Sequence, residues 1–408
     1  MKKFAKAYPW IVVALLWVVA LLNYMDRQML STMREVMALD IAELASAERF
    51  GALMAIFLWI YGCVSPFGGA IADRLSRKWL IIASLAVWSA VTLLMGRCTT
   101  FGQIYALRAL MGVSEALYIP AGLSLISDYH EGTTRSFAIG IHMTGLYIGQ
   151  AAGGFGAKLG QMLGWQDTFH WFGLAGILYA IVLIFCLKDK KAEPAVKDAP
   201  VAKLPVGKSF AMILGNVSFW VILFFFASSS LPGWATKNWL PTLFSGTLGI
   251  PMTEAGPIST ITIAASSFLG VMIGGPLSDR WVKKNLKGRI YTSALGFALM
   301  IPALVLIGLG HSLGTVVAAG VFFGIGYGMF DTNNMPILCQ FVPRRLRATA
   351  YGLMNMTGVF AGALCTTVLG RWADRGQLGL AFSVLAILVA AALTLELTVL
   401  RPTTDNME

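Results

Sequence analysis

Long apolar runs recur from one end of this chain to the other, and they constrain the fold more than any other feature. A membrane-spanning helix needs roughly 20 predominantly apolar residues to cross about 30 Å of hydrocarbon. Most of the runs are too long for sandwich strands, and they lack the alternation of a membrane barrel. The runs are Val12–Leu22, Leu80–Met95, Leu174–Leu187, Val221–Phe226, Ile301–Leu309 and Ala381–Leu393. We therefore predict an all-α membrane protein.

Composition supports the same class. Only 12 % of the 408 residues are charged, against about 25 % in soluble domains. The first apolar run is followed by Asn23–Arg27 rather than by a small-residue cleavage site, so we predict a retained helix and no cleaved signal peptide. The five cysteines are scattered without a CxxC pair, so we expect neither a metal site nor a disulfide framework, and no cofactor. The sequence has no HExxH or GxSxG motif, so we do not expect an enzyme.

Glycines, prolines and charges divide the chain into twelve predicted transmembrane helices. The predicted spans are 8–33, 48–72, 79–97, 102–128, 134–161, 168–187, 211–245, 254–278, 290–310, 313–341, 347–371 and 377–400. An even number puts both termini on one side. If that side is cytoplasmic, it carries 22 Lys and Arg residues against seven opposite, which is the bias of cytoplasmic loops. This bias accounts for the net charge of +11 without a nucleic-acid partner.

One motif occurs twice, half a chain apart. Gly68–Lys78 reads GGAIADRLSRK, and Gly274–Lys284 reads GGPLSDRWVKK, with an offset of 206 residues. The duplication predicts two pseudo-symmetric six-helix bundles, 1–187 and 210–408, joined by a cytoplasmic linker, 188–209. Parallel repeats place a substrate site near the membrane midplane between the halves.

The repeated motif resembles the signature loop of the major facilitator superfamily. The resemblance covers the whole chain and implies alternating access by rocking of the two halves. Paired glycines let two helices approach closely, and the following charges can hold or release a cytoplasmic gate. The predicted gating residues are Gly69, Asp73, Arg74, Gly275, Asp279 and Arg280.

Ionisable residues inside a predicted span suggest function. The clearest four belong to spans 1 and 4; Asp331 in span 10 is a further candidate, and Glu396 lies near the inner end of span 12, where we expect it to be wet. Asp26 and Arg27 lie in span 1, and Arg108 and Glu115 lie two turns apart in span 4. Asp26 and Glu115 are candidates for carrying a proton, with Arg108 as a partner for an acid. Arg27 keeps its charge, so it suits a fixed clamp for a carboxylate. The alternative is a structural charge network that locks spans 1 and 4 together.

Tyr24–Ser31, YMDRQMLS, resembles a motif of the anion:cation symporter family, and so does Arg108–Ala121, RALMGVSEALYIPA. Members carry sugar acids, sialic acid and other organic anions, usually with protons. The resemblance implies that Arg27 holds the substrate carboxylate, and that Tyr24, Tyr61 and Asn355 line the site. The chain is also similar to the Spinster family, which moves lysolipids and sphingolipid phosphates.

Polar residues in two glycine-rich spans are further candidates for substrate contact. His142, Tyr147 and Gln150 lie in span 5, with helix packing as the alternative. Thr332, Asn333 and Asn334 precede a proline in span 10, which suggests a broken, cavity-lining segment. Span 7 shows a similar interruption over 228–241, where tryptophans either stack on a sugar ring or join the interfacial belt. Glycines recur every fourth residue at 145, 149 and 153 and at 320, 324 and 328, which predicts close helix contacts.

Taken together, the residues and the resemblance predict a monomeric, proton-coupled symporter in a bacterial inner membrane. Its expected partners are a proton, a small organic anion and the lipid bilayer. The anion is a sugar acid or a sialic-acid-like monocarboxylate. A Spinster-like lipid transporter is the alternative.

Overall fold

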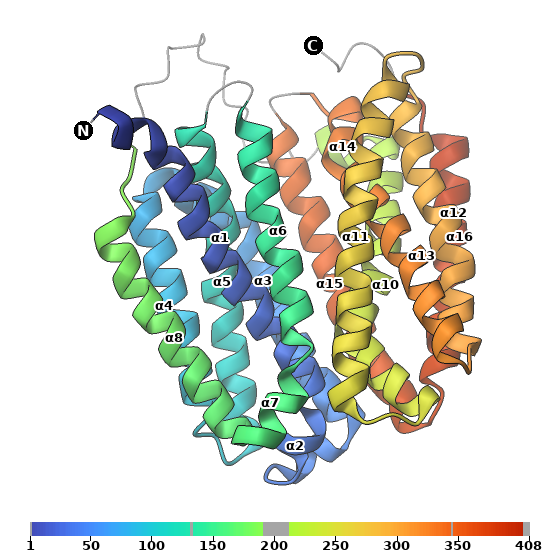
Figure 1. The fold of residues 1–408 in the computed structure, drawn as a ribbon. Coiled ribbons are helices and arrows are strands. Elements are labelled where there is room, and N and C mark those ends of the chain that lie inside the picture. Colours follow the sequence, from blue (N-terminus) through green and yellow to red (C-terminus); the bar gives the residue numbers. More distant parts are fainter. Residues whose placement is uncertain (1, 131–133, 191–211, 344–345, 403–408) are drawn as a thin grey trace. The chain divides into compact units, whose positions relative to one another are not determined.

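The computed structural model describes residues 2–130, 134–190, 212–343 and 346–402, and every regular element in this part of the chain is a helix. The chain divides into two compact units (Figure 1). Met1–Glu193 and Ile250–Ile261 form the N-terminal unit, and the remaining residues form the C-terminal unit. The predicted linker, 188–209, lies almost entirely outside the described residues.

The helices of the first half are α1 (Lys2–Thr32), α2 (Arg34–Ala38), α3 (Ala47–Arg74), α4 (Arg77–Met95), α5 (Phe101–Tyr129), α6 (Arg135–Gly153), α7 (Gly156–Leu163) and α8 (Trp165–Cys186), with a 3₁₀ turn, η1, at Ala42–Ala45. Those of the second half are α10 (Val217–Leu248), α11 (Met252–Val282), α12 (Gly288–Leu309), α13 (Leu313–Asp331), α14 (Asn334–Phe341), α15 (Arg347–Asp374) and α16 (Leu378–Val399). The all-α prediction is thus confirmed over the described residues.

Eleven helices among the described residues are long and apolar enough to cross a membrane. Predicted span 5 is not one of them, since it consists of α6 and α7 with a break at Gly154 and Phe155. Its polar and glycine residues lower its mean hydropathy. Predicted span 10 is broken as expected, because α13 ends at Asp331 and α14 begins at Asn334. These features describe a multi-pass membrane protein.

The interruption predicted in span 7 is wrong. Helix α10 runs without a break through Pro232 and Pro241. A proline removes one backbone hydrogen bond, and neighbouring helices or nearby Ser and Thr side chains can compensate for it in a membrane helix. Here Asn238 donates to the hydroxyl of Thr366 on α15 at 2.9 Å, and the indole of Trp239 donates to the Thr366 carbonyl at 3.0 Å. These bonds hold α10 against α15 beside the second proline.

Short polar residues start several helices. Thr100 caps α5 in a capping box with Gln103, and Ser46 caps α3. In the second half, Asn216 caps α10 and Ser312 caps α13. Each side-chain oxygen accepts from a backbone N–H that the first helical turn leaves unpaired, so the sequence fixes where these spans begin.

Helices pair in the same order within each unit, which supports the predicted duplication. In the N-terminal unit the pairs are α1 with α6, α3 with α5, α4 with α8 and α4 with α5. In the C-terminal unit the corresponding pairs are α10 with α15, α11 with α13, α12 with α16 and α12 with α13. In each unit the first helix also contacts the fourth: α1 contacts α5, and α10 contacts α13.

The predicted glycine contacts are confirmed. On α6 the three glycines lie against Trp17, Leu21 and Met25 of α1, and on α13 the three lie against Thr262, Ser266 and Ser267 of α11. Small residues let two membrane helices approach until their backbones touch. The close packing of α1 on α6 thus depends on the absence of side chains at these positions.

We expect Gly149→Ala to destabilise the protein, because a Cβ atom there would overlap the carbonyl oxygen of Leu21. Overpacking of this kind costs about 1–3 kcal/mol. Gly140→Ala on the same helix is the matched control, since nothing lies within 4 Å of its Cβ position. Thermal unfolding in detergent should show a lower midpoint for the first variant only; equal midpoints would contradict the packing argument.

The two copies of the repeated motif lie at the ends of α3 and α11. Gly69 belongs to α3, while the side chains of Asp73 and Arg74 lie outside the described residues. In the second copy Asp279 and Arg280 are exposed, and Gly275 lies 3.7 Å, measured from its Cβ position, from the hydroxyl of Thr332. The gating role of these residues remains a prediction.

Candidate functional site

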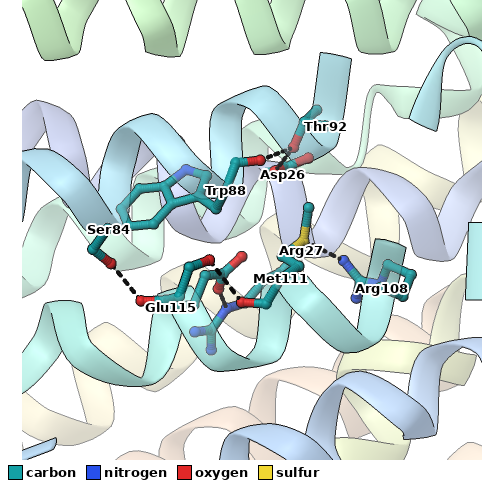
Figure 2. A network of polar contacts seen from close by, with 9 residues as sticks. Asp26, Arg27, Ser84, Trp88, Thr92, Arg108, Met111 and Glu115 are labelled. Carbon is teal, nitrogen blue, oxygen red and sulfur yellow. Dashed lines mark hydrogen bonds and ion pairs between the residues drawn. The ribbon is translucent and has the colours of Figure 1, made fainter. Parts of the chain in front are cut away.

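An arginine–carboxylate pair joins the first and fourth helices of the N-terminal unit. Arg27 of α1 donates through Nε to Oε2 of Glu115 of α5 (Figure 2). The side chain of Arg27 is 12 % exposed and that of Glu115 is fully buried. Among the described residues, one terminal nitrogen of Arg27 and Oε1 of Glu115 have no hydrogen-bond partner. The guanidinium therefore has a donor to spare in a buried setting.

Three aromatic rings surround this guanidinium. Its carbon lies 5.2 Å from the ring centroid of Tyr24, 4.8 Å from that of Phe57 and 5.0 Å from that of Tyr61. Such contacts stabilise a cation and fix the plane of the guanidinium. Arg27 is consequently held in place while part of its hydrogen-bonding capacity stays unused.

Asp26 and Arg27 do not pair with each other, although they are adjacent. The carboxylate of Asp26, 6 % exposed, is directed at α4, where its Oδ2 lies 2.5 Å from the hydroxyl of Thr92. Successive helical residues point about 100° apart, so Asp26 contacts α4 and Arg27 contacts α5.

Arg108 completes a cluster of two cations and two carboxylates. It is 3 % exposed, its guanidinium carbon lies 4.7 Å from the ring centroid of Phe57, and it interacts electrostatically with both Glu115 and Asp26. A side-chain nitrogen of Arg108 lies 2.9 Å from the sulfur of Met111. The structure thus brings together the four ionisable residues predicted in spans 1 and 4, whereas Asp331, the further candidate, lies at the end of α13 in the C-terminal unit.

The remaining candidates of the N-terminal unit lie on α6. His142 and Gln150 are buried and Tyr147 is half-buried. The imidazole of His142 lies against the Tyr118 ring, with 6.1 Å between centroids. The role of these three residues in substrate binding stays a prediction.

In the C-terminal unit the candidates divide between packing and a second charged group. Asn333, between α13 and α14, donates to the Met329 carbonyl of α13 at 2.8 Å, and Thr332 lies against the glycines at 274 and 275. Asn334 donates to Oδ1 of Asp331 at 3.1 Å. Asn355 is half-buried on α15.

Sequence reasoning missed the depth of two charged residues. Lys237 is one of the seven Lys and Arg residues that the sequence analysis assigns to the side opposite the termini, yet it lies inside α10, eleven residues before the end of that helix. Glu396 seemed to lie in a wet position near the end of span 12, yet its side chain is fully buried beside α12. The prolines that flank Lys237 suggested a helix end, and only the continuous helix shows that this lysine is within a span.

Comparison with known proteins places these residues in context. The family model of the Major Facilitator Superfamily matches residues 16–366. A probable galactarate/D-glucarate transporter of Bacillus subtilis (strain 168) is 24 % identical over 401 residues, covering 88 % of this chain and 85 % of that protein. A D-galactonate transporter of Escherichia coli O6:H1 is 24 % identical over 403 residues, covering 90 % of this chain and 89 % of that protein.

A solved structure shares the fold. It is a bacterial homologue of the human lysosomal transporter Spinster in an inward-facing, unoccupied conformation, with a TM-score of 0.81, 20 % identity and 96 % of each chain covered. The repeated helix pairing, the multi-pass architecture and the family match over most of the sequence agree. This chain belongs to the Major Facilitator Superfamily.

Proposed function

We propose that this protein is a proton-coupled symporter that imports a small organic anion by alternating access. The substrate is a sugar acid or a sialic-acid-like monocarboxylate. The observation that carries the proposal is the buried guanidinium of Arg27, which is fixed by three rings and keeps one nitrogen without a partner. A planar guanidinium with free N–H groups suits bidentate binding of a carboxylate. The names of the relatives from Bacillus subtilis and Escherichia coli support a sugar acid.

Glu115 provides a physical link between proton and anion. While ionised, it competes with a substrate carboxylate for the same guanidinium. A proton on Glu115 removes the competing charge and leaves Arg27 available for the anion. Release of the proton on the other side of the membrane restores the pair and expels the anion, so the two move together.

Asp26 is the second proton-binding candidate. The Thr92 hydroxyl lies within hydrogen-bond distance of both Asp26 Oδ2, at 2.5 Å, and the Trp88 carbonyl, at 3.0 Å. A hydroxyl has one hydrogen to donate. Both contacts are satisfied when Asp26 carries a proton and donates to Thr92, which then donates to Trp88. This geometry supports a protonated state of Asp26.

We place the protein in the inner membrane of a bacterial cell, as a monomer with both termini in the cytoplasm. The excess of Lys and Arg on the side of the termini supports that orientation. The exposed Asp279 and Arg280 in the last turn of α11 then lie at the cytoplasmic surface, where a gate that opens to the cytoplasm would act.

Uptake into liposomes tests the proposal. Purified protein should accumulate a labelled sugar acid or sialic acid when the outside is acidic, and uptake should collapse when a protonophore removes the gradient. A Spinster-like lipid transporter is the second candidate, favoured by the shared fold. Movement of a lysolipid in the same liposomes, without uptake of any acid in the panel, would establish that alternative instead.

A further inference from the structure

The end of α4 and the beginning of α8 form a groove on the surface of the N-terminal unit, apart from the charge cluster around Arg27. The two helices pack side by side (Figure 1). The groove has a volume of about 350 Å³. It is lined by both ionisable and apolar side chains, namely Leu93, Arg97, Asp167, His170, Trp171 and Leu174. A ligand that fits it must therefore have a charged part and an apolar part.

Glycines fix the floor of this groove. A Cβ atom at Gly96, directly after α4, would lie 2.5 Å from the carbonyl oxygen of Gln166 and 3.1 Å from the His170 ring. A Cβ atom at Gly173 would lie 2.5 Å from the backbone nitrogen of Leu93. Small residues of this kind let two membrane helices touch along their backbones. The groove is thus set by the packing of the two helices and needs no ligand to form.

The groove presents a cation and a carboxylate that do not pair with each other. Among the described residues, the exposed guanidinium of Arg97 has no hydrogen bond or ion pair. The carboxylate of Asp167 is exposed as well, and its Oδ1 lies 3.5 Å from Nδ1 of His170. Asp40 anchors the turn that carries Asp167, because its Oδ2 accepts from the side chains of the two preceding residues at 2.7 Å each. Both charges are available to a ligand that has an anionic and a cationic group.

The groove lies at the end of the unit that is away from the N-terminus. Tyr8 of α1 donates to the carbonyl of Cys186, the last residue of α8, at 2.8 Å, so the first turns of α8 are at the opposite membrane surface. Of the eleven candidate spans, α8 has the smallest buried share, and Trp171 and Leu174 are exposed. Tryptophan is enriched at membrane–water interfaces. The apolar wall thus faces acyl chains, and the charges lie at the level of the lipid headgroups.

We propose that this groove binds a zwitterionic phospholipid whose headgroup carries a phosphate and a primary ammonium, as in phosphatidylethanolamine. Arg97 binds the phosphate through charge-assisted hydrogen bonds, and Asp167 accepts hydrogen bonds from the ammonium. The acyl chains lie along Trp171 and Leu174. A quaternary ammonium has no N–H to donate to Asp167, and an anionic glycerol headgroup brings no cation to it. The site therefore selects for a free ammonium, and this selection does not depend on which anion the protein transports.

Native mass spectrometry of the delipidated full-length protein tests the site. The probes are phosphatidylethanolamine, phosphatidylcholine and phosphatidylglycerol with identical acyl chains. Wild-type protein should bind its first phosphatidylethanolamine about fivefold more tightly than either of the others, the factor that corresponds to the roughly 1 kcal/mol of an exposed ion pair.

Two substitutions should separate the contacts to the two parts of the headgroup. Arg97→Gln should weaken binding of all three lipids, because all three carry the phosphate. Asp167→Asn should keep the phosphate contact and bring the affinity ratio of phosphatidylethanolamine to phosphatidylcholine close to one. Arg49→Gln is the matched control: this exposed arginine lies at the start of α3, outside the groove, and its loss should change neither the affinities nor the ratio. Thermal unfolding of each lipid-free variant distinguishes loss of binding from loss of fold.

Equal affinity of wild-type protein for phosphatidylethanolamine and phosphatidylcholine would overturn the inference, and so would an unchanged preference in Asp167→Asn. Tighter binding of phosphatidylglycerol than of phosphatidylethanolamine would show that the carboxylate does not meet the headgroup, with the same consequence. Unaltered binding of all three lipids in Arg97→Gln would place the lipid elsewhere. None of these results bears on Arg27, so the proposed transport of an anion stands or falls separately.

Discussion

Replacing Arg27 with alanine should abolish binding of the transported anion. Its guanidinium is fixed by Tyr24, Phe57 and Tyr61 and keeps one nitrogen unpaired, so it is the strongest anchor for a carboxylate in the N-terminal unit. Truncating one partner of a buried, hydrogen-bonded charge pair costs about 2–5 kcal/mol, which corresponds to roughly a 30- to 4,000-fold loss of affinity. Calorimetry with the anion that the wild-type protein binds measures this loss of affinity directly.

Arg49→Ala is the matched control, because this arginine also lies over a ring, that of Phe101 at 5.8 Å, but is exposed outside the site. It should bind normally. Arg27→Lys keeps the charge but loses the planar fork, so we expect intermediate affinity.

A double variant separates an anion clamp from a structural lock. Arg27→Ala leaves Glu115 buried without its cation, which destabilises the fold as well as the site. Adding Glu115→Gln removes that buried charge and should recover much of the thermal stability. If the pair only locks α1 to α5, the recovered double variant should bind the anion again. If Arg27 is the clamp, the double variant should be stable and still fail to bind.

The sequence predicts the cluster well because its motifs are local. Arg108 and Glu115 are two turns apart, so their shared helix face follows from helical geometry alone. The hydroxyl partner of Asp26 could not be foreseen in the same way: Thr92 is 66 residues away and reaches the carboxylate only after α1 and α4 have packed together. Long-range partners of this kind depend on packing that a single sequence does not encode in any local pattern.

Lys237 is a case in which a local sequence pattern predicts the wrong structure. Two prolines and three serines predicted a broken segment, and a lysine beside a helix break is easily assigned to a loop. The structure keeps α10 continuous, since Asn238 and Trp239 bond to Thr366 on α15. Tertiary contacts thus decide whether a proline breaks a membrane helix. They thereby also decide whether a nearby charge lies inside or outside the membrane.

Glu115→Gln should separate anion transport from proton coupling. Glutamine has the shape of a protonated glutamate and cannot ionise, so Arg27 stays available for the anion but no proton is bound or released at this position. With the membrane potential clamped at zero, an inward gradient of one pH unit supplies about 1.4 kcal/mol per proton. Wild-type protein that moves one proton per anion should reach about tenfold accumulation, while Glu115→Gln should equilibrate near onefold and still exchange labelled for unlabelled anion.

Asp26→Asn measured under the same conditions identifies where the coupled proton resides. Asp26 touches Thr92 rather than the anion clamp, so its proton reaches Arg27 only through the charge cluster, whereas Glu115 contacts Arg27 directly. We therefore expect the larger loss of accumulation in Glu115→Gln. Tenfold accumulation by Glu115→Gln, with loss of accumulation in Asp26→Asn, would transfer the coupling role to Asp26 and leave Glu115 as the counter-ion that holds Arg27 in its aromatic setting.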